Sequence, residues 1–253
     1  METRVTIPAL QQMKRDGRKI VGVVAWDFRI AQIADRAGVE IVSVGDSVGI
    51  NLWGHATPLE VTMDEMIVVC KAVRRGTKRA IVSCDLPYGP LQESVRAAVR
   101  AAARLMKEGG ADMVKLDAAA ESPEAVTAIV SEGIPVFAQF GVTPHTQGPE
   151  QTTEKLADDA KRLEAAGAVL LDFTHSGPVA GPAVVKAVSI PVLGGMGGGP
   201  WLDGRMRMAH AAIGYAASML ESPKTTYANV ARITLDALTA YSEDVRAARQ
   251  IKS

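Results

Sequence analysis

The stretch KIVGVVAWDFRIAQIADRAGVEIVSVGDSVG, residues 19–49, contains one complete strand–helix–strand unit. Residues 19–25 and 39–45 are short apolar runs rich in β-branched side chains, whereas residues 28–38 place apolar side chains at helical spacing and end at a glycine. Nearly continuous apolar strands that alternate with amphipathic helices are typical of a parallel sheet covered on both faces. The stretch therefore predicts a βαβ unit.

The same alternation recurs along the chain and predicts its fold class. Further strands are expected at residues 79–85, 111–117, 134–140, 168–173 and 190–195, with helices between them at 62–76, 91–110, 122–133, 152–167 and 181–189. An eighth strand at 204–210 would close a barrel, a helix at 8–17 would cover its floor, and terminal helices are expected at 211–220 and 226–250. Repeated units without a break in composition favour an α/β fold, a (β/α)8 TIM barrel that forms a single domain over residues 1–253, rather than an open doubly wound sheet.

Composition limits the class of partner. The 253 residues carry 28 Lys and Arg against 28 Asp and Glu, so no basic field points to nucleic acid or to an anionic membrane. Two cysteines in apolar segments do not make a disulfide framework. Because no apolar run approaches the ~20 residues of a membrane span and the N-terminal segment has no signal-peptide core, we expect a cytoplasmic protein with small-molecule partners.

Polar side chains gather at the ends of the expected strands, where barrel enzymes carry their chemistry. A single aspartate there is most often a helix N-cap, but five acids and a lysine exceed what turns require. These side chains are Asp27, Asp46, Ser47, Asp85, Lys115, Asp117, Gln139 and Asp172. The carboxyl rim of the barrel is therefore the expected site.

Asp46 and Asp85 each follow an apolar strand directly, so their carboxylates would repel one another unless a cation lies between them. Oxygen ligands without a cluster of histidine or cysteine favour Mg2+ over zinc. The four histidines share no metal-ligand spacing: His55, His145, His175 and His210. We therefore expect Asp46 and Asp85 to bind magnesium.

The glycine-rich segment GGMGGGP, residues 194–200, is a weak motif. Barrels often bind phosphate in this region, but the segment lacks the Lys-Ser/Thr ending of a P-loop. It equally fits a close backbone approach that leaves room for a ligand.

Several motifs in order resemble the ketopantoate hydroxymethyltransferase family, a member of the phosphoenolpyruvate mutase/isocitrate lyase type of barrel. They include VGDSVG at 44–49, TMDEM at 62–66, KAVRRG at 71–76, CDLPYG at 84–89, GIPVFAQFGVTPH at 133–145 and IPVLGGMGGGPWLDG at 190–204. The ordered similarity spans roughly residues 5–215.

The resemblance implies a homo-oligomer, a decamer of two pentameric rings, that transfers a one-carbon unit from 5,10-methylenetetrahydrofolate to 3-methyl-2-oxobutanoate, as in pantothenate biosynthesis. By matching positions, Asp46 and Asp85 would bind Mg2+, and Ser47 and Lys115 would contact the carboxylate of the 2-oxo acid. Asp172 matches the base that removes the C3 proton, with His175 next in line for that role.

Four positions depart from the family pattern. Asp117 and Asp172 stand where the family has glutamate, Gln139 stands where it usually has histidine, and Trp26 replaces tyrosine. Aspartate is shorter by one methylene, and a misplacement of about 1 Å can cost ~100-fold in rate. The departures, together with a shorter segment after residues 143–148, predict a specialised relative that acts on a related 2-oxo acid.

Three readings of the function stay open at this point. The first is the Mg2+-dependent hydroxymethyltransferase, in which Asp172 forms an enolate and Lys115 balances its charge. The second is a folate-independent Mg2+-dependent lyase or mutase that uses the same enolate. The third is a barrel that has lost catalysis. A structural ion pair with Asp117 or Asp85 is the alternative role of Lys115.

Overall fold

The computed structural model describes residues 3–141, 152–221 and 226–249, so the predicted short segment after residues 143–148 and His145 lie outside the described residues. The chain forms two compact units, Met1–Met206 and Arg207–Ser253. The expectation of one domain over residues 1–253 stays a prediction.

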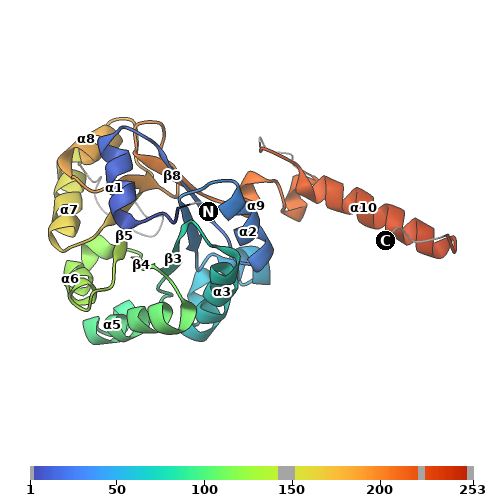
Figure 1. The fold of residues 1–253 in the computed structure, drawn as a ribbon, viewed down its shortest axis with the longest axis horizontal. Coiled ribbons are helices and arrows are strands. Elements are labelled where there is room, and N and C mark those ends of the chain that lie inside the picture. Colours follow the sequence, from blue (N-terminus) through green and yellow to red (C-terminus); the bar gives the residue numbers. More distant parts are fainter. Residues whose placement is uncertain (1–2, 142–151, 222–225, 250–253) are drawn as a thin grey trace. The chain divides into compact units, whose positions relative to one another are not determined.

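Eight strands follow one another in chain order around a closed barrel, with parallel pairing between successive neighbours (Figure 1). They are β1 (Ile20–Val24), β2 (Ile41–Val44), β3 (Ile81–Asp85), β4 (Met113–Leu116), β5 (Val136–Gly141), β6 (Leu170–Thr174), β7 (Val192–Gly194) and β8 (Gly204–Met208). The predicted (β/α)8 barrel, including its less regular eighth strand, is confirmed.

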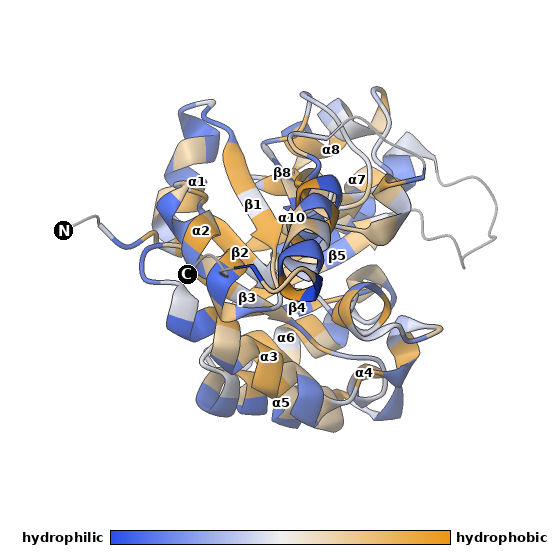
Figure 2. Ribbon diagram, turned by 90° about the vertical axis from the view of Figure 1, so that its right-hand side faces the viewer, coloured by the Kyte–Doolittle hydropathy of each residue, from blue (hydrophilic) through white to orange (hydrophobic). Residues whose placement is uncertain are grey.

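Helices precede the barrel, separate its strands and follow it. They are α1 (Ile7–Arg15), α2 (Phe28–Arg36), α3 (Met63–Gly76), α4 (Pro90–Glu93), α5 (Val95–Arg104), α6 (Pro123–Ser131), α7 (Thr153–Ala165), α8 (Ala180–Ala187), α9 (Ala209–Ala212) and α10 (Val230–Arg246). The strands are mostly apolar, whereas the helices carry apolar and hydrophilic residues together, as a layer between core and solvent requires (Figure 2).

Two predicted helices are wrong in detail. The helix expected at 91–110 is divided at Ser94, whose backbone is extended (φ −174°) and whose hydroxyl accepts a hydrogen bond from the N–H of Ala97 at 3.1 Å. Ser94 thus begins a new helix as its N-cap. The helix expected at 211–220 ends after α9, because Gly214 adopts a left-handed conformation (φ +66°) that helices do not continue through.

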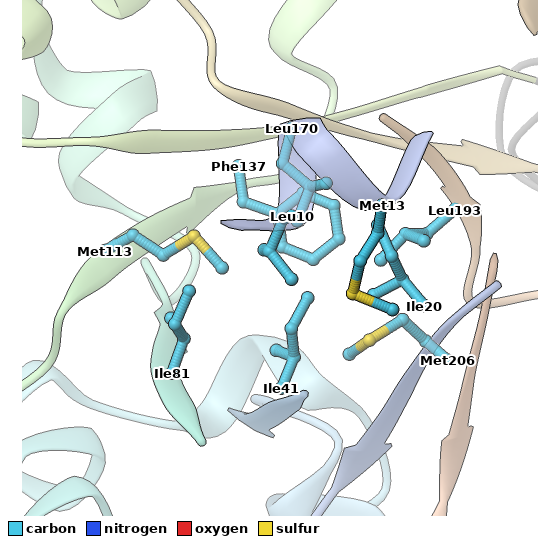
Figure 3. Packing of buried hydrophobic residues seen from close by; sticks show 10 residues of the cluster. All are labelled: Leu10, Met13, Ile20, Ile41, Ile81, Met113, Phe137, Leu170, Leu193 and Met206. Carbon is cyan, nitrogen blue, oxygen red and sulfur yellow. The ribbon is translucent and has the colours of Figure 1, made fainter. Parts of the chain in front are cut away.

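The floor of the barrel is a closed apolar cluster. Each strand contributes one side chain to it, and the amphipathic helix α1 adds Leu10 and Met13 (Figure 3). The strand side chains are Ile20, Ile41, Ile81, Met113, Phe137, Leu170, Leu193 and Met206. This confirms the prediction that a helix near residues 8–17 covers the floor.

Above this floor the inward positions change from apolar to polar, because side chains on a strand alternate between its two faces. Three strands follow this pattern toward their carboxyl ends: Ile81, Ser83 and Asp85; Met113, Lys115 and Asp117; Leu170, Asp172 and Thr174. The alternation brings ionisable side chains into the barrel at the carboxyl rim.

The second unit contains helix α10, whose N-cap Asn229 accepts a hydrogen bond from the N–H of Arg232 at 3.0 Å. Large apolar side chains on this helix are exposed, among them Ile233, Leu238 and Tyr241. In the described part of the chain, no helix is long and apolar enough to cross a membrane. The free cysteines Cys70 and Cys84 are both buried.

Candidate active site

Lys115 lies at the centre of the polar rim. Its ammonium nitrogen is 2.9 Å from Oδ1 of Asp117, 3.4 Å from Oδ2 of Asp85 and 3.9 Å from Oδ2 of Asp172. The predicted ion pairs with Asp117 and Asp85 are therefore present. Although burial lowers the pKa of Lys115, the carboxylates of Asp117, Asp85 and Asp172 outweigh it and raise the pKa well above its ordinary value, which keeps the side chain cationic.

Asp85 is the last residue of β3 and lies opposite Lys115 in the register between β3 and β4. Burial raises the pKa of this carboxyl well above its ordinary value, the carboxylates of Asp117 and Asp46 raise it further, and Lys115 acts against them. Among the described residues, Oδ1 of Asp85 is buried without a hydrogen-bond partner. A buried acceptor of this kind calls for a cation or donor that binding would bring.

Asp46 lies just after β2, the strand that pairs with β3 in the barrel. Its pKa is raised to about 6, first by burial and then by the charge of Asp117, while Lys115 and the backbone N–H of Ser47 act in the opposite direction. The preceding Gly45 is held in place by a 3.0 Å hydrogen bond from the indole N–H of Trp26 to its carbonyl. A side chain at position 45 would meet the Ser47 hydroxyl at 2.9 Å, so glycine lets this hydroxyl lie close to the strand end.

Asp172 is a buried residue of β6, and only 3% of its surface is exposed. Its Oδ1 accepts a 2.7 Å hydrogen bond from the backbone N–H of Gly195. Burial raises the pKa of Asp172, against the influence of Lys115 and of this hydrogen bond. Gln139 of β5 is its partner in the register between the two strands, which puts both residues at the same level of the barrel.

The donor set fits a hard divalent cation. Asp46 and Asp85 supply oxygens from adjacent strands, each carboxylate is held near the other's negative charge, and one buried oxygen of Asp85 lacks a partner in the residues described. No group of three or more His, Cys, Asp or Glu with metal-binding geometry occurs in residues 3–141, 152–221 and 226–249. A cation here would take two protein carboxylates and fill its shell with substrate and water oxygens, as Mg2+ commonly does.

Some predicted rim residues do not join this cluster. Asp27 is the N-cap of α2 and accepts hydrogen bonds from the N–H groups of Arg29 and Ile30 at 2.8 and 2.9 Å. Asp27 thus serves as a helix N-cap. Ser47 adjoins Asp46, but its contact with a substrate stays a prediction, as does that of Gln139.

Sequence reasoning missed two features of the site. Below Asp85, the hydroxyls of Ser43 and Ser83 form a buried 2.6 Å hydrogen bond between β2 and β3. The alternation of the strands could have indicated this pair, since Ser83 shares a face with Asp85. The second feature is the hydrogen bond from the Gly195 N–H to Asp172, which nothing in the sequence except the glycine-rich segment indicated.

Solved structures share the fold of this barrel. A structure titled 2,3-dimethylmalate lyase, a PEP mutase/isocitrate lyase superfamily member, is similar with a TM-score of 0.64 and 16% identity, and the match covers 85% of this chain and 84% of that one. The carboxyl transferase domain of Rhizobium etli pyruvate carboxylase with pyruvate gives a TM-score of 0.58 at 15% identity, over 89% of this chain and 48% of that one. At these identities the likeness shows the (β/α)8 fold alone.

Sequence comparison identifies the family. Residues 4–250 match the family described as ketopantoate hydroxymethyltransferase. Relatives named 3-methyl-2-oxobutanoate hydroxymethyltransferase include one from Cyanothece sp., 39% identical over 96% of both chains, and one from Moorella thermoacetica, 39% identical over 96% of this chain and 94% of the relative. The chain belongs to the ketopantoate hydroxymethyltransferase family and is an enzyme of the transferase class.

Proposed function

We propose that the protein transfers a hydroxymethyl group to C3 of a 2-oxo acid, 3-methyl-2-oxobutanoate or a close relative, with Mg2+ as cofactor and 5,10-methylenetetrahydrofolate as one-carbon donor. The observation that carries this proposal is the buried carboxylate of Asp172 beside the cation of Lys115 at the carboxyl rim. The names of the relatives supply the substrate class.

Asp172 is the base in this proposal. It accepts the C3 proton of the substrate, and the electron pair of the C–H bond moves into the enolate. Burial raises its pKa, which makes this carboxylate a stronger proton acceptor than an exposed aspartate. Lys115 is held cationic by three carboxylates, so it can balance the negative charge of the substrate carboxylate.

Asp46 and Asp85 would hold the magnesium ion. When bound, Mg2+ supplies Lewis-acid stabilisation of the charge that develops on the keto oxygen. The chain's own contribution is to place these two carboxylates at the carboxyl ends of neighbouring strands, with Asp85 buried and Asp46 partly buried.

The remaining residues orient the substrates. The Ser47 hydroxyl, together with Lys115, would hold the substrate carboxylate, and Gln139 and Asp117 would also contact the substrate. The enolate carbon then forms a bond to the methylene carbon of the donor, both carbon–nitrogen bonds of that methylene carbon break, and water supplies the hydroxyl oxygen. The two folate nitrogens take up the proton lost from C3 and the second proton of the water. A site closed by apolar packing below limits side reactions of the enolate.

The assembly and compartment are part of the same proposal. We infer a cytoplasmic homo-oligomer, a decamer by family resemblance, and exposed apolar side chains such as Ile233 and Leu238 on α10 support self-association. Sedimentation velocity would detect a decamer as a species ten times the 26.7 kDa chain mass, whereas a purely monomeric boundary would contradict the assembly.

A donor and acceptor panel tests the activity. The purified protein is incubated with Mg2+ and 3-methyl-2-oxobutanoate, or with longer and shorter 2-oxo acids, in the presence and absence of 5,10-methylenetetrahydrofolate. The proposal predicts a hydroxymethylated 2-oxo acid only when the folate is present. Cleavage of a 2-hydroxy or phosphono diacid without folate would instead support a lyase or mutase, for which the similar solved structures provide only a likeness of fold.

A further inference from the structure

The carboxylate of Asp172 is held unequally at its two oxygens. Oδ1 accepts the N–H of Gly195 at 2.7 Å, which is a short and strong contact for a charged acceptor. Oδ2 is 3.9 Å from the ammonium nitrogen of Lys115, a distance too long for a direct hydrogen bond. One oxygen is thus fixed by the backbone, and the other keeps its capacity to accept a proton.

Gly195 reaches this position only because it has no side chain. A Cβ atom built on its backbone would lie 2.8 Å from Oδ2 and 3.1 Å from Oδ1 of Asp172. The backbone of Gly195 is not left-handed, so an alanine could adopt it without strain. The requirement for glycine at this position therefore comes from the close approach to Asp172.

The loop that carries Gly195 is itself held against the barrel. The carbonyl of Met196 accepts the N–H of His175 at 2.6 Å, and the carbonyl of Gly198 accepts a hydrogen bond from the Arg205 guanidinium. The carbonyl of Pro200 accepts a hydrogen bond from Lys19 at 2.9 Å. Because these anchors flank Gly195 on its C-terminal side, the loop cannot easily retreat to relieve a clash at Asp172.

We propose that Gly195 is a positioning residue for the base of the reaction: its N–H fixes one carboxylate oxygen of Asp172, so that the other oxygen receives the C3 proton. This inference rests on the proposed function. In the step, the C3–H bond breaks, its electron pair enters the enolate, and the proton forms an O–H bond with the oxygen that does not accept the Gly195 N–H. The glycine-rich segment then positions the base instead of binding phosphate. We call the hydrogen bond from the Gly195 N–H to Asp172 the backbone clamp.

Gly195→Ala tests the clamp, with Gly177→Ala as its matched control. A Cβ at Gly177 meets no atom within 4 Å, and the backbone there is also not left-handed. The measurement is incorporation of solvent deuterium at C3 of 3-methyl-2-oxobutanoate with Mg2+ and without folate. We expect Gly195→Ala to exchange about 100-fold more slowly, since that is the effect of a misplacement near 1 Å. The KM for the 2-oxo acid should change by less than about threefold, because substrate binding does not depend on the base.

A double-mutant cycle separates positioning from general damage. If Gly195 acts through Asp172, adding Gly195→Ala to Asp172→Asn should slow exchange no further. An additional loss in the double variant, or normal exchange in Gly195→Ala, would overturn the inference while leaving the enolate reaction in place. Absence of exchange in the unmodified protein would overturn both the proposed function and the clamp.

A crystal structure of the unmodified protein with bound 3-methyl-2-oxobutanoate keeps the test independent of how Gly195→Ala folds. The oxygen of Asp172 nearest to C3 should be the one that does not accept the Gly195 N–H. The opposite arrangement, or a Gly195 nitrogen farther than hydrogen-bond distance from both oxygens, would overturn the inference.

Discussion

Asp85 is a buried carboxylate whose charge is compensated on one side only. Oδ2 faces Lys115 at 3.4 Å, while Oδ1 lacks a hydrogen-bond partner in the described part of the chain. Leaving such an oxygen without a partner is costly, because the interior cannot replace the water that it loses. A cation shared with Asp46 would remove this cost and would lower the raised pKa of both groups.

Asp46→Asn should therefore weaken magnesium binding. The variant removes one of only two proposed carboxylate ligands, so the expected loss of affinity exceeds the roughly 10–100-fold that follows mutation of outer-shell partners. Isothermal titration with Mg2+ measures it. Asp27→Asn is the matched control, since Asp27 caps a helix near the same rim and asparagine caps equally well. Unchanged affinity in Asp46→Asn would remove Asp46 from the metal site.

The raised pKa of Asp172 predicts a pH dependence of C3 exchange. A base works only when it is deprotonated, so exchange at saturating Mg2+ should be full at high pH and fall as the pH drops through the raised pKa. The acidic limb should lie above the ordinary aspartate value of 3.8. Exchange followed by NMR across this range measures the limb, and a limb at or below 3.8 would contradict the buried environment assigned to Asp172.

Among the secondary-structure elements, the periodic pattern of the sequence was sufficient to predict the strands and most helices. The apolar runs at residues 39–45 and 79–85 contain β2 and β3, because burial on both faces leaves a nearly continuous apolar signal. The break at Ser94 could not be predicted, since serine is tolerated within helices and only its extended backbone reveals an N-cap. Glycine at position 214 is a common sign of a helix end, but the apolar residues around it suggested that the helix continued.

The sequence indicated the residues of the candidate site and, for Lys115, an ion pair with Asp117 or Asp85, but not its other contacts. Asp85 ends β3, Asp46 follows β2, and Lys115 and Asp172 lie within β4 and β6; parallel strands bring their carboxyl ends to one rim. That Lys115 also lies 3.9 Å from Asp172 follows from the closure of the barrel, which no local pattern contains. The Gly195 contact involves a backbone N–H, which every residue except proline possesses, so its partner cannot be read from residue types.

Helix α1 contributes to stability rather than chemistry. Leu10 is 2% exposed and packs in the floor cluster with Ile20 and Met113 (Figure 3). Leu10→Ala should reduce the free energy of unfolding by about 2–5 kcal/mol, the usual cost of a cavity in a packed core. Leu59→Ala, at a position 57% exposed, is the control and should change it far less. Denaturant unfolding measures both, and equal effects would show that α1 does not seal the floor.

At the scale of the whole molecule, the barrel separates stability from reaction. The apolar cluster occupies the end covered by α1, and the ionisable residues occupy the opposite, carboxyl ends of the strands. Packing at one end can therefore hold strands rigidly while the other end keeps charged groups close together. This division lets the barrel keep buried carboxylates at one end while the other end holds the strands together.

The central claim is that this rim forms an enolate from a 2-oxo acid with Asp172 as the base. The most direct measurement is deuterium incorporation at C3 of 3-methyl-2-oxobutanoate in heavy water, with Mg2+ and without folate, for the unmodified protein and for Asp172→Asn. We expect rapid exchange in the first and a loss of ~100-fold to 10,000-fold in the second, the range of general-base catalysis. Equal exchange rates in the two proteins, or none in either, would contradict it.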